Sequence, residues 1–213
     1  MKQGAKATRD RILDAGLDLL STSGFAGVTL GVLADKVGMS KSGLFAHFSS
    51  KEEVELELLS RTFEIAADQV MGAAMQAPEG LPRLEAAALG WFGWFAKAGF
   101  PGGCPVAGAM FEFDDVDGQV RNKVLTRAKH WDEAFRQLVI DAITRKHLRK
   151  NLDVDQFMWE LRSIYLGHHV ALRFFRDSDA DSRAKKAFQR LVESALPIAS
   201  SRSSKQKLVT KRK

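Results

Sequence analysis

Apolar residues recur every three or four positions along most of this 213-residue chain, which is the spacing of helices with one buried face. No segment shows the strict alternation of a half-buried strand. A first helix is predicted over residues 8–23, because Ile12 and Leu19 fall on the same face. Gly24 follows and is expected to end this helix. The pattern as a whole predicts an all-α protein.

Two short helices joined by a tight turn are predicted between residues 29 and 51. Thr29 can cap the first, because its hydroxyl can accept a hydrogen bond from an unpaired backbone N–H. Gly38 can end that helix in the left-handed conformation at little cost, and Ser40 can cap the next one. The apolar residues of the second helix are expected to return to the core, and are Leu44, Phe45 and Phe48. This is the pattern of a helix-turn-helix, although an ordinary helical hairpin in a larger bundle would have a similar composition.

A longer helix is expected to begin at residue 51, because Ser50 and Glu53 have the spacing of a capping box. In such a box the serine accepts from the backbone three residues on, and the glutamate reaches back to the serine N–H. The helix is expected to continue to about Met75, a length of roughly 37 Å at 1.5 Å per residue. A rod of this length can join the helix-turn-helix to the rest of the chain.

Further helices are predicted over residues 81–98, 105–113, 119–147, 153–175 and 182–199. The segment 81–98 is apolar nearly all round and is therefore expected to be buried. Residues 99–105 hold three glycines and two prolines, and they form the strongest internal interruption. Asp153 and Gln156 form a second candidate capping box. About nine helices are expected, with a three-helix N-terminal helix-turn-helix domain joined to a C-terminal helical bundle.

The formal net charge of +6 is unevenly distributed along the chain. Residues 1–50 hold six basic and four acidic residues, residues 51–200 hold 20 and 22, and residues 201–213 hold six and none. The last segment lacks core-forming residues and is expected to be a disordered basic tail. It can add non-specific affinity for DNA or only solubility. We therefore divide the chain at residues 1–50, 51–200 and 201–213.

The N-terminal segment resembles the DNA-binding domain of the TetR/AcrR family of bacterial transcriptional regulators. The resemblance is carried by residues 8–20, 29–38 and 40–48 and by Lys51. It implies that residues 1–50 are a helix-turn-helix domain that binds a double-stranded DNA operator. It further implies that residues 51–200 are a ligand-binding and dimerisation domain.

The resemblance implies a DNA-binding face made of Thr29, Ser40, Lys41, Ser42, Gly43, His47 and Lys51. Among these, Thr29, His47 and Lys51 match positions that contact phosphates, and Lys41, Ser42 and Gly43 match positions that face bases. Phe45 stands where the family usually has a tyrosine that donates to a phosphate, so it is expected only to pack. This helix holds no arginine or glutamine for bidentate base contacts, and specificity is expected to rest on Lys41, thymine methyl contacts and DNA shape.

Two residues of this face carry a small energetic cost in an isolated helix. Lys51 begins a helix, where its positive charge opposes the helix dipole by a few tenths of a kcal/mol, roughly. Gly43 costs about 1 kcal/mol relative to alanine inside a helix. A phosphate beside Lys51 and a close approach of DNA to Gly43 would explain both. A solvated lysine and simple tolerance of glycine in a short helix would explain them too.

The last two predicted helices carry wide apolar stripes that suggest a partner surface. A helix-turn-helix reads few base pairs, and a twofold dimer doubles the contact across two half-sites. The resemblance implies a homodimer with a four-helix interface, for which the candidate residues are Phe157, Leu161, Ile164, Phe188, Leu191, Val192 and Ala195. The same helix pair could instead pack wholly inside its own monomer.

Aromatic residues are frequent between residues 91 and 175 and suit an apolar ligand pocket, although each could equally be plain core. The candidate ligand residues are Trp91, Phe95, Cys104, Phe111, Trp131 and Tyr165. No cofactor and no metal site are expected. His168 and His169 are adjacent and therefore lie on different faces of a helix, and His168 is expected in the core or an interface.

Cys104 is the single cysteine, so an internal disulfide is excluded. It precedes Pro105, a favoured first residue of a helix, and a helix N-terminus lowers the pKa of a thiol. The Gly-Cys-Pro segment is similar to one in a subset of TetR-like regulators that resemble electrophile or oxidant sensors. Cys104 is therefore a candidate sensor, with a small packing residue as the alternative.

We therefore expect a homodimeric transcriptional repressor, not an enzyme, that a small apolar or electrophilic effector releases from its operator. No apolar run approaches the roughly 18 residues of a membrane span, and the polar N-terminus has no signal-peptide pattern, so a cytoplasmic location is expected. Two other classes stay open. One is an all-α thiol enzyme that uses Cys104, and the other is a nucleoid protein that binds DNA without sequence preference.

Overall fold

A computed structural model describes residues 2–197, and over this range the chain is helical with no strand. The helices are α1 (Lys2–Gly27), α2 (Leu30–Val37), α3 (Lys41–Phe45), α4 (Lys51–Ala66), the π-helical stretch η1 (Ala67–Gly72), α5 (Leu81–Trp91), α6 (Trp94–Lys97), α7 (Pro105–Glu112), α8 (Gln119–Thr144), α9 (Val154–Arg173) and α10 (Ala180–Ala195). The all-α prediction is confirmed. The predicted basic tail and the last residues of the predicted 182–199 helix lie outside the described residues.

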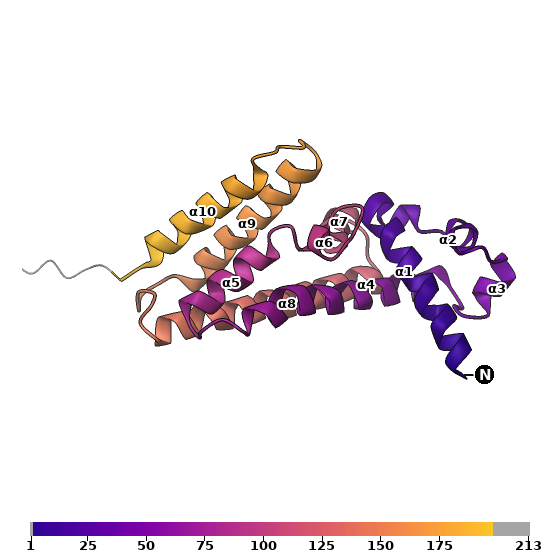
Figure 1. Ribbon diagram of the computed structural model, residues 1–213, viewed down its shortest axis with the longest axis horizontal. Helices are drawn as coiled ribbons and strands as arrows, with labels where there is room; N and C mark the ends of the chain where they lie inside the picture. The colour runs from indigo at the N-terminus through magenta and orange to yellow at the C-terminus, as the bar shows by residue number, and fades with distance from the viewer. Residues whose placement is uncertain (1, 198–213) are drawn as a thin grey trace, which may run out of the picture.

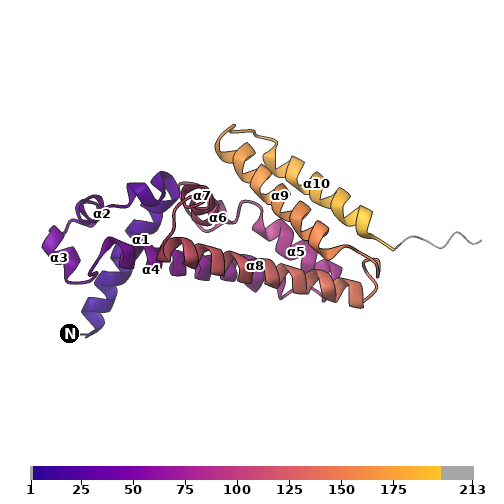
Figure 2. The same ribbon diagram turned by 180° about the vertical axis from the view of Figure 1, so that it is seen from behind.

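The molecule is elongated, with α1, α2 and α3 together at one end (Figure 1). Helices α4 and α8 pack side by side along its length, and the α9–α10 hairpin lies towards the other end (Figures 1 and 2). Helices α6 and α7 lie in the middle, where α7 packs against α1, α4 and α8. None of the helices in residues 2–197 is long and apolar enough to cross a membrane.

The predicted caps of the helix-turn-helix are all present. The Thr29 hydroxyl accepts the N–H of Val32 at 3.2 Å, and α2 ends at Gly38, whose φ of 67° is left-handed. The Ser40 hydroxyl accepts the N–H of Gly43 at 3.0 Å and starts α3. These bonds satisfy backbone groups that a helix end otherwise leaves unpaired, which is why the sequence alone could place them.

Phe45 does not return to the core as predicted. Its side chain is 51% exposed, whereas the preceding Leu44 is fully buried. Successive residues of a helix point about 100° apart, and in the short α3 the inward position is taken by Leu44 while Phe45 points to the surface. Phe48, which follows the turn after α3, is buried as predicted.

One of the two hydrogen bonds predicted for the capping box of α4 is present, and the other goes to a different residue. The Ser50 hydroxyl accepts the N–H of Glu53 at 3.1 Å, as expected. The Glu53 carboxylate reaches back one residue further, to the N–H of Ser49 at 2.7 Å and its hydroxyl at 2.6 Å. The helical run then continues through the unpredicted π-helical stretch Ala67–Gly72 to Ala74, close to the expected end near Met75.

The predicted helix over residues 81–98 is broken into two. Phe92 is extended, and Gly93 has a φ of 69°, a conformation that glycine adopts at little cost. The prediction failed because an apolar run shows no periodicity that would reveal a break. The change of direction turns both Trp91 and Trp94 inward, where they are buried.

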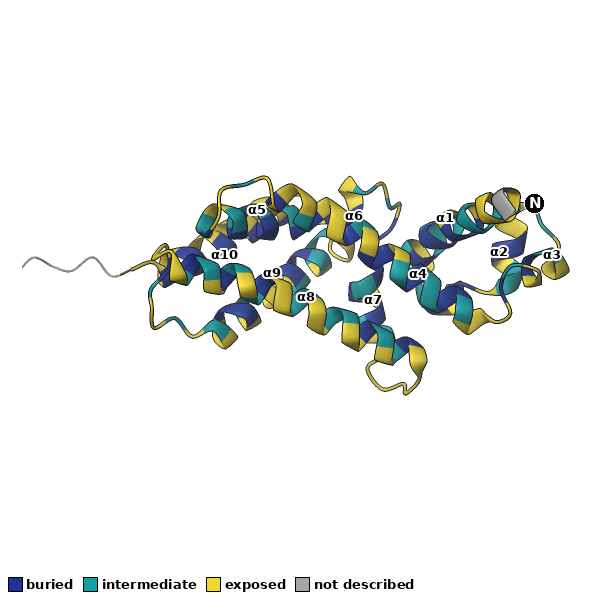
Figure 3. Ribbon diagram, turned by 90° about the horizontal axis from the view of Figure 1, so that it is seen from below, coloured by how far each residue is buried: buried dark blue, intermediate teal, exposed yellow. Residues whose placement is uncertain are grey.

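Two groups of buried side chains form the core, and Figure 3 shows them as dark blue faces along the helices. The larger group lies among η1 and α5–α10. The smaller group joins α1, α2 and α3 with residues of α4, such as Leu58 and Phe63, and with Ala109, Val120 and Val124 of α7 and α8. Side chains from outside residues 1–50 therefore complete the core beneath the helix-turn-helix.

Candidate functional site

The predicted DNA-binding residues lie at the end of the molecule that carries α3 (Figure 1). The exposed ones are Thr29, Ser40, Lys41, Ser42 and Lys51, and the half-buried ones are Gly43 and His47. They border α2, α3 and the start of α4. The fold thus brings together on the surface all the residues that the resemblance selected.

Local contacts account for two of these residues without DNA. The Ser40 hydroxyl lies 3.0 Å from the Ser42 hydroxyl and also caps α3, so it is already engaged. A Cβ at Gly43 would lie 3.2 Å from the Ser40 oxygen, which is tighter than ordinary contact. The narrow cap therefore gives a structural reason for glycine at residue 43.

Lys51 has an anionic partner within the chain. Its ammonium lies 3.2 Å from a carboxylate oxygen of Glu55, one turn later. Glu55 is 9% exposed, and burial raises its pKa while the nearby lysine opposes that rise. Lys51 thus compensates a buried acid, yet its side chain stays 43% exposed and can reach a phosphate.

Arg9 of α1 is a structural residue of this region that the sequence analysis missed. Its guanidinium donates to the backbone carbonyl of His47 and to the carboxylates of Glu53 and Glu57 on α4. It also lies 4.0 Å from the centre of the Phe48 ring. A single side chain therefore fixes α4 and the end of the helix-turn-helix against α1. The signal in the sequence was the pair of glutamates four residues apart on α4.

The same network perturbs Glu53. Hydrogen bonds from Ser49, and then the Arg9 guanidinium, lower the pKa of Glu53 from 4.5 to about 2. Its carboxylate is thus held in the ionised form, which is the form that both partners favour.

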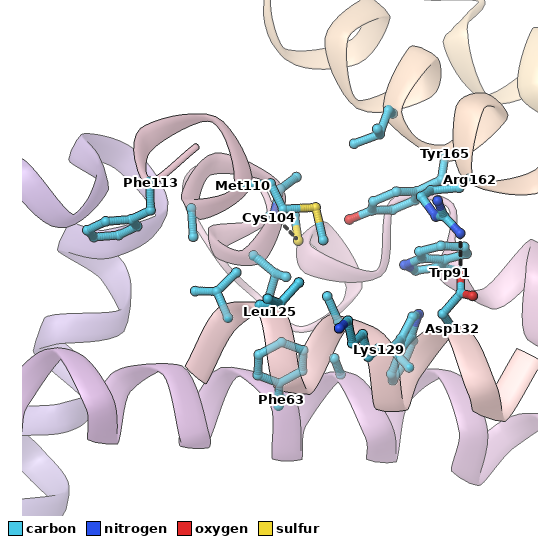
Figure 4. Close-up of a pocket in the computed structure, with 18 of the residues that line it drawn as sticks. Phe63, Trp91, Cys104, Met110, Phe113, Leu125, Lys129, Asp132, Arg162 and Tyr165 are labelled. Atoms are coloured by element: carbon cyan, nitrogen blue, oxygen red, sulfur yellow. Dashed lines mark hydrogen bonds and ion pairs between the residues drawn. The ribbon is translucent and has the colours of Figure 1, made fainter. Parts of the chain in front are cut away.

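A cavity of about 500 Å³ lies in the body of the molecule, between α4, α5, α7, α8 and α9 (Figure 4). The predicted ligand residues that line it are Trp91, Cys104, Trp131 and Tyr165. The rings of Trp91 and Tyr165 stack with centroids 4.1 Å apart and planes 11° apart. The volume falls within the range of pockets that hold small organic molecules.

Two predicted ligand residues lie elsewhere. Phe95 is buried outside the lining and packs its edge on His169, with ring centroids 5.4 Å apart. Phe111 is 61% exposed. The prediction for Phe111 is wrong because its neighbour Met110 faces the cavity, and adjacent residues of a helix point in different directions.

Helix α8 contributes lining residues that were not predicted. Arg121, Leu125, Lys129 and Asp132 line the cavity at spacings of three and four residues. This spacing places them along one face of the helix. A helix face that mixes apolar and charged residues was the signal that could have found them.

Two side chains of the cavity wall carry buried polar atoms that are poorly satisfied within the described residues. The Trp131 Nε1 makes no hydrogen bond, and the Tyr165 hydroxyl has only the sulfur of Cys104, a weak acceptor, beside it. Figure 4 shows the Tyr165 oxygen pointing towards Cys104 and Met110. An ion pair between Arg162 and Asp132 forms part of the wall.

Cys104 lies at the start of α7 as predicted, but its pKa is shifted in the opposite direction from the one predicted. Its sulfur caps α7 by accepting the N–H of Ala107 at 3.4 Å, and its own N–H donates to His169 Nε2 at 3.1 Å. Burial raises the pKa of the Cys104 thiol, more than the nearby Tyr165 hydroxyl and the Ala107 N–H lower it. The predicted lowering of this pKa is therefore wrong, because desolvation outweighs the helix terminus.

Helix α7 and the loop before it are fastened to α1. The Glu112 carboxylate accepts the N–H groups of Phe25 at 2.8 Å and Ala26 at 2.5 Å. The N–H groups of Gly102 and Gly103 donate to the hydroxyl and carbonyl of Ser21, at 3.1 and 2.9 Å. Both ends of the segment that passes the cavity are thus bonded to the helix that supports the DNA-binding face.

The predicted dimer residues face the interior of their own chain. Buried within the monomer are Phe157, Leu161, Phe188, Leu191, Val192 and Ala195, and Ile164 is half-buried. The apolar stripes of α9 and α10 therefore hold the hairpin together and pack on the body. A shallow groove on α9 and α10 includes two of the predicted dimer residues, Ile164 and Leu191. It is lined by Trp159, Glu160, Ser163, Ile164, Ala187, Arg190, Leu191 and Ser194. Trp159 is 60% exposed there.

His168 is buried, and its Nε2 lies 2.7 Å from a carboxylate oxygen of Asp181, while its Nδ1 has no partner in the described structure. This pair joins the buried His168 of α9 to the exposed Asp181 of α10. Within the part of the chain that the structure describes, no three histidine, cysteine or acidic side chains are grouped to hold a metal ion.

Comparison with known proteins identifies both halves of the chain. Residues 12–58 match the family model described as bacterial regulatory proteins, tetR family. Residues 80–188 match the model described as tetracyclin repressor-like, C-terminal domain. The HTH-type transcriptional regulator TtgW of Pseudomonas putida is 37% identical over 65 residues, which are 30% of this chain and 48% of that protein. The match thus spans about half the length of this relative.

Solved structures share the fold. A TetR transcriptional regulator from Chloroflexus aurantiacus J-10-FL superposes with a TM-score of 0.84 at 22% identity, over 93% of this chain and 100% of that one. A TetR-family regulator from Cytophaga hutchinsonii gives a TM-score of 0.79 at 20% identity, over 92% and 98% of the two chains. The arrangement of helices around the cavity is therefore one that known proteins also adopt.

Proposed function

This chain belongs to the tetR family of bacterial regulatory proteins, and we propose that it is a sequence-specific DNA-binding transcriptional repressor that a small effector releases from its operator. The observation that carries the proposal is the connection of an exposed helix-turn-helix to the cavity in the body through α7. Such a regulator acts on double-stranded DNA, and therefore in the bacterial cytoplasm.

The DNA-binding part of the proposal rests on the exposed face around α3. Lys41 is exposed at the start of α3 and can reach base edges or phosphates in a groove. Thr29 and Lys51 border the same face from α2 and α4. We assign phosphate contacts to these two residues and sequence reading to α3.

The regulatory part rests on α7. Cys104 and Met110 line the cavity, and Glu112 holds the backbone of α1 two residues after Met110. A ligand that displaces the cavity side of α7 therefore also displaces its bonds to α1. Release of DNA requires that the ligand bind the displaced arrangement more tightly than the DNA-bound one.

The proposed dimer interface is the groove on α9 and α10, which includes the predicted residues Ile164 and Leu191 and adds Trp159. The groove combines the exposed indole of Trp159 with the small residues Ser163 and Ala187, which allow a second helix pair to approach closely. Exposed tryptophan is typical of interface centres. We propose that two copies meet across this groove and place their α3 helices in successive half-sites.

An enzymatic role is not part of the proposal. A thiol enzyme needs Cys104 as a thiolate, and burial raises the pKa of this thiol. The proposed effector accordingly occupies the cavity, and a reaction with Cys104 is not required.

The test of the proposed function is binding of the full chain to the promoter that it protects from nuclease digestion. Lys51→Ala should weaken binding to this site and to random duplex alike, and should lower the salt slope by about 0.9 for one phosphate. Lys41→Ala should in addition reduce the preference for the specific site. Lys150→Ala, an exposed lysine in the turn after α8, is the matched control and should change neither.

Two results would contradict the proposal. One is full affinity and specificity in both Lys41→Ala and Lys51→Ala with their folding intact. The other is equal affinity of the wild-type protein for every duplex, which is the behaviour of a nucleoid protein.

A further inference from the structure

We propose that the effector is an apolar carboxylate, an anion with a hydrocarbon or aromatic body. The inference rests on the proposed function in that it assigns the cavity to the effector. It comes from the chemistry of the cavity wall, which is apolar over most of its surface but presents hydrogen-bond donors and positive charge at a few positions.

The buried polar groups of the wall favour a ligand that carries a hydrogen-bond acceptor. The Trp131 Nε1–H can only donate, and the Tyr165 hydroxyl can donate to any suitably placed oxygen. Both are buried. Trp131 Nε1 has no partner among the described residues, and the Tyr165 hydroxyl has only the weakly accepting sulfur of Cys104 beside it. Leaving buried donors unpaired is costly, so a ligand that supplies oxygen atoms is favoured over a pure hydrocarbon.

The charges in the wall favour a negative ligand. Asp132 is already paired with Arg162, so these two charges offset each other. Arg121, Lys129 and Asp114 also line the cavity, and none of the three forms an ion pair with a described residue, so the wall keeps one net positive charge. Figure 4 shows Lys129 on the α8 side of the space and Tyr165 on the α9 side. A carboxylate between them can accept from both.

The aromatic rings bind the body of the ligand and do not form a cage for a cation. Tyr165 stacks on Trp91 at 4.1 Å, and Phe135 packs 4.8 Å from the same ring. The faces of Trp91 are thus used within the protein, whereas cation–π binding needs open ring faces. Phe63 and Leu125 supply further apolar surface for a chain or a ring.

The test compares four molecules that share one ten-carbon chain: decanoate, decanamide, decanol and decylamine. Binding to the full-length protein is measured by calorimetry and by tryptophan fluorescence, at concentrations below micelle formation. Decanoate should bind at least about tenfold more tightly than decanamide or decanol, because only the carboxylate adds a charge-assisted bond. Decylamine should bind most weakly.

Variants locate the carboxylate. Lys129→Met should weaken decanoate binding about tenfold and leave decanamide unchanged, since the apolar stem is kept. Tyr165→Phe should weaken decanoate and decanamide alike, by roughly two- to tenfold, because one hydrogen bond is lost. Lys123→Met is the matched control, because this lysine lies on the same helix but outside the cavity lining. It should change nothing.

The outcomes separate the ligand class from the proposed function. The carboxylate proposal would be overturned by equal affinity for decanoate and decanamide, or by tightest binding of decylamine. It would also be overturned if Lys129→Met left decanoate binding unchanged, or if none of the four molecules bound. Operator binding without ligand is measured in parallel. If the protein binds its operator but fails these tests, only the carboxylate proposal is contradicted. If it binds decanoate through Lys129 but binds no operator, only the proposed function is contradicted.

Discussion

Gly102, in the loop before α7, packs directly against the backbone of α1, which makes this residue a sharp test of the contact. A Cβ at this position would lie 1.8 Å from the carbonyl oxygen of Ser21, 2.2 Å from its carbonyl carbon and 2.7 Å from the nitrogen of Thr22. All three are backbone atoms, so no side-chain rotation can make room. In Gly102→Ala the loop must therefore move away from α1.

The magnitude follows from what this movement breaks. The hydrogen bonds from Gly102 and Gly103 to Ser21 are lost, at about 1 kcal/mol each. Displacement of packed backbone adds at least about 1 kcal/mol. The free energy of unfolding should fall by about 3 kcal/mol, and a chain of this size then loses roughly 6–12 °C in Tm.

The assay is thermal unfolding followed by circular dichroism, with Gly108→Ala as the control. Gly108 lies in α7, six residues further along, and a Cβ there would meet no atom within 4 Å. Alanine at this position should raise stability by up to about 1 kcal/mol through helix propensity. A Tm of Gly102→Ala within a degree or two of the wild type would refute the close contact between the loop and α1.

Three further outcomes are expected. Because the pKa of Glu53 is about 2 when folded and 4.5 ordinarily, its ionised form stabilises the fold above pH 4.5, and this contribution disappears as the pH falls to 2. The decrease in Tm between pH 4.5 and pH 2 should be smaller in Glu53→Gln than in the wild type. Equal decreases would contradict the hydrogen bonds of Glu53 to Ser49 and Arg9. Alkylation of Cys104 by iodoacetamide should be slow and should accelerate only above its ordinary pKa of 9.0, whereas a midpoint near neutrality would revive the sensor hypothesis. Trp159→Glu should give a folded monomer in sedimentation, whereas Val192→Glu, which places a charge in the core outside the groove, should unfold the protein. A Trp159→Glu protein that stays a dimer would show that the interface lies elsewhere.

Helix caps and helix ends that depend on residues close in sequence could be predicted. The caps at Thr29, Ser40 and Asp153 involve a side chain and a backbone N–H three residues away, so the local pattern contains both partners. The end of α2 at Gly38 likewise depends on one residue's backbone freedom. These local signals placed the helix-turn-helix and most helix boundaries.

Features that depend on distant partners could not be predicted. The sequence shows a cysteine at a helix start, but the burial that raises the pKa of Cys104 comes from helices far along the chain. The break at Phe92–Gly93 and the exposure of Phe111 depend on which side of each helix meets the body. The apolar stripe that includes Leu191 was real, but sequence cannot distinguish a stripe that faces the chain's own core from one that faces a partner.

The smaller core has a consequence for how the chain comes apart. Leu58 and Phe63 lie beyond residue 50, as do Ala109 and Val120, yet all four pack with the side chains of α1, α2 and α3. A fragment cut at residue 50 would leave this apolar surface in water, so the helix-turn-helix should not melt as an independent unit. Amide protons of α1 and α4 should exchange together with those of α8, in one cooperative opening. Anything that tightens the middle of the molecule, including a molecule held in the cavity, should then slow hydrogen exchange at the DNA-binding end as well.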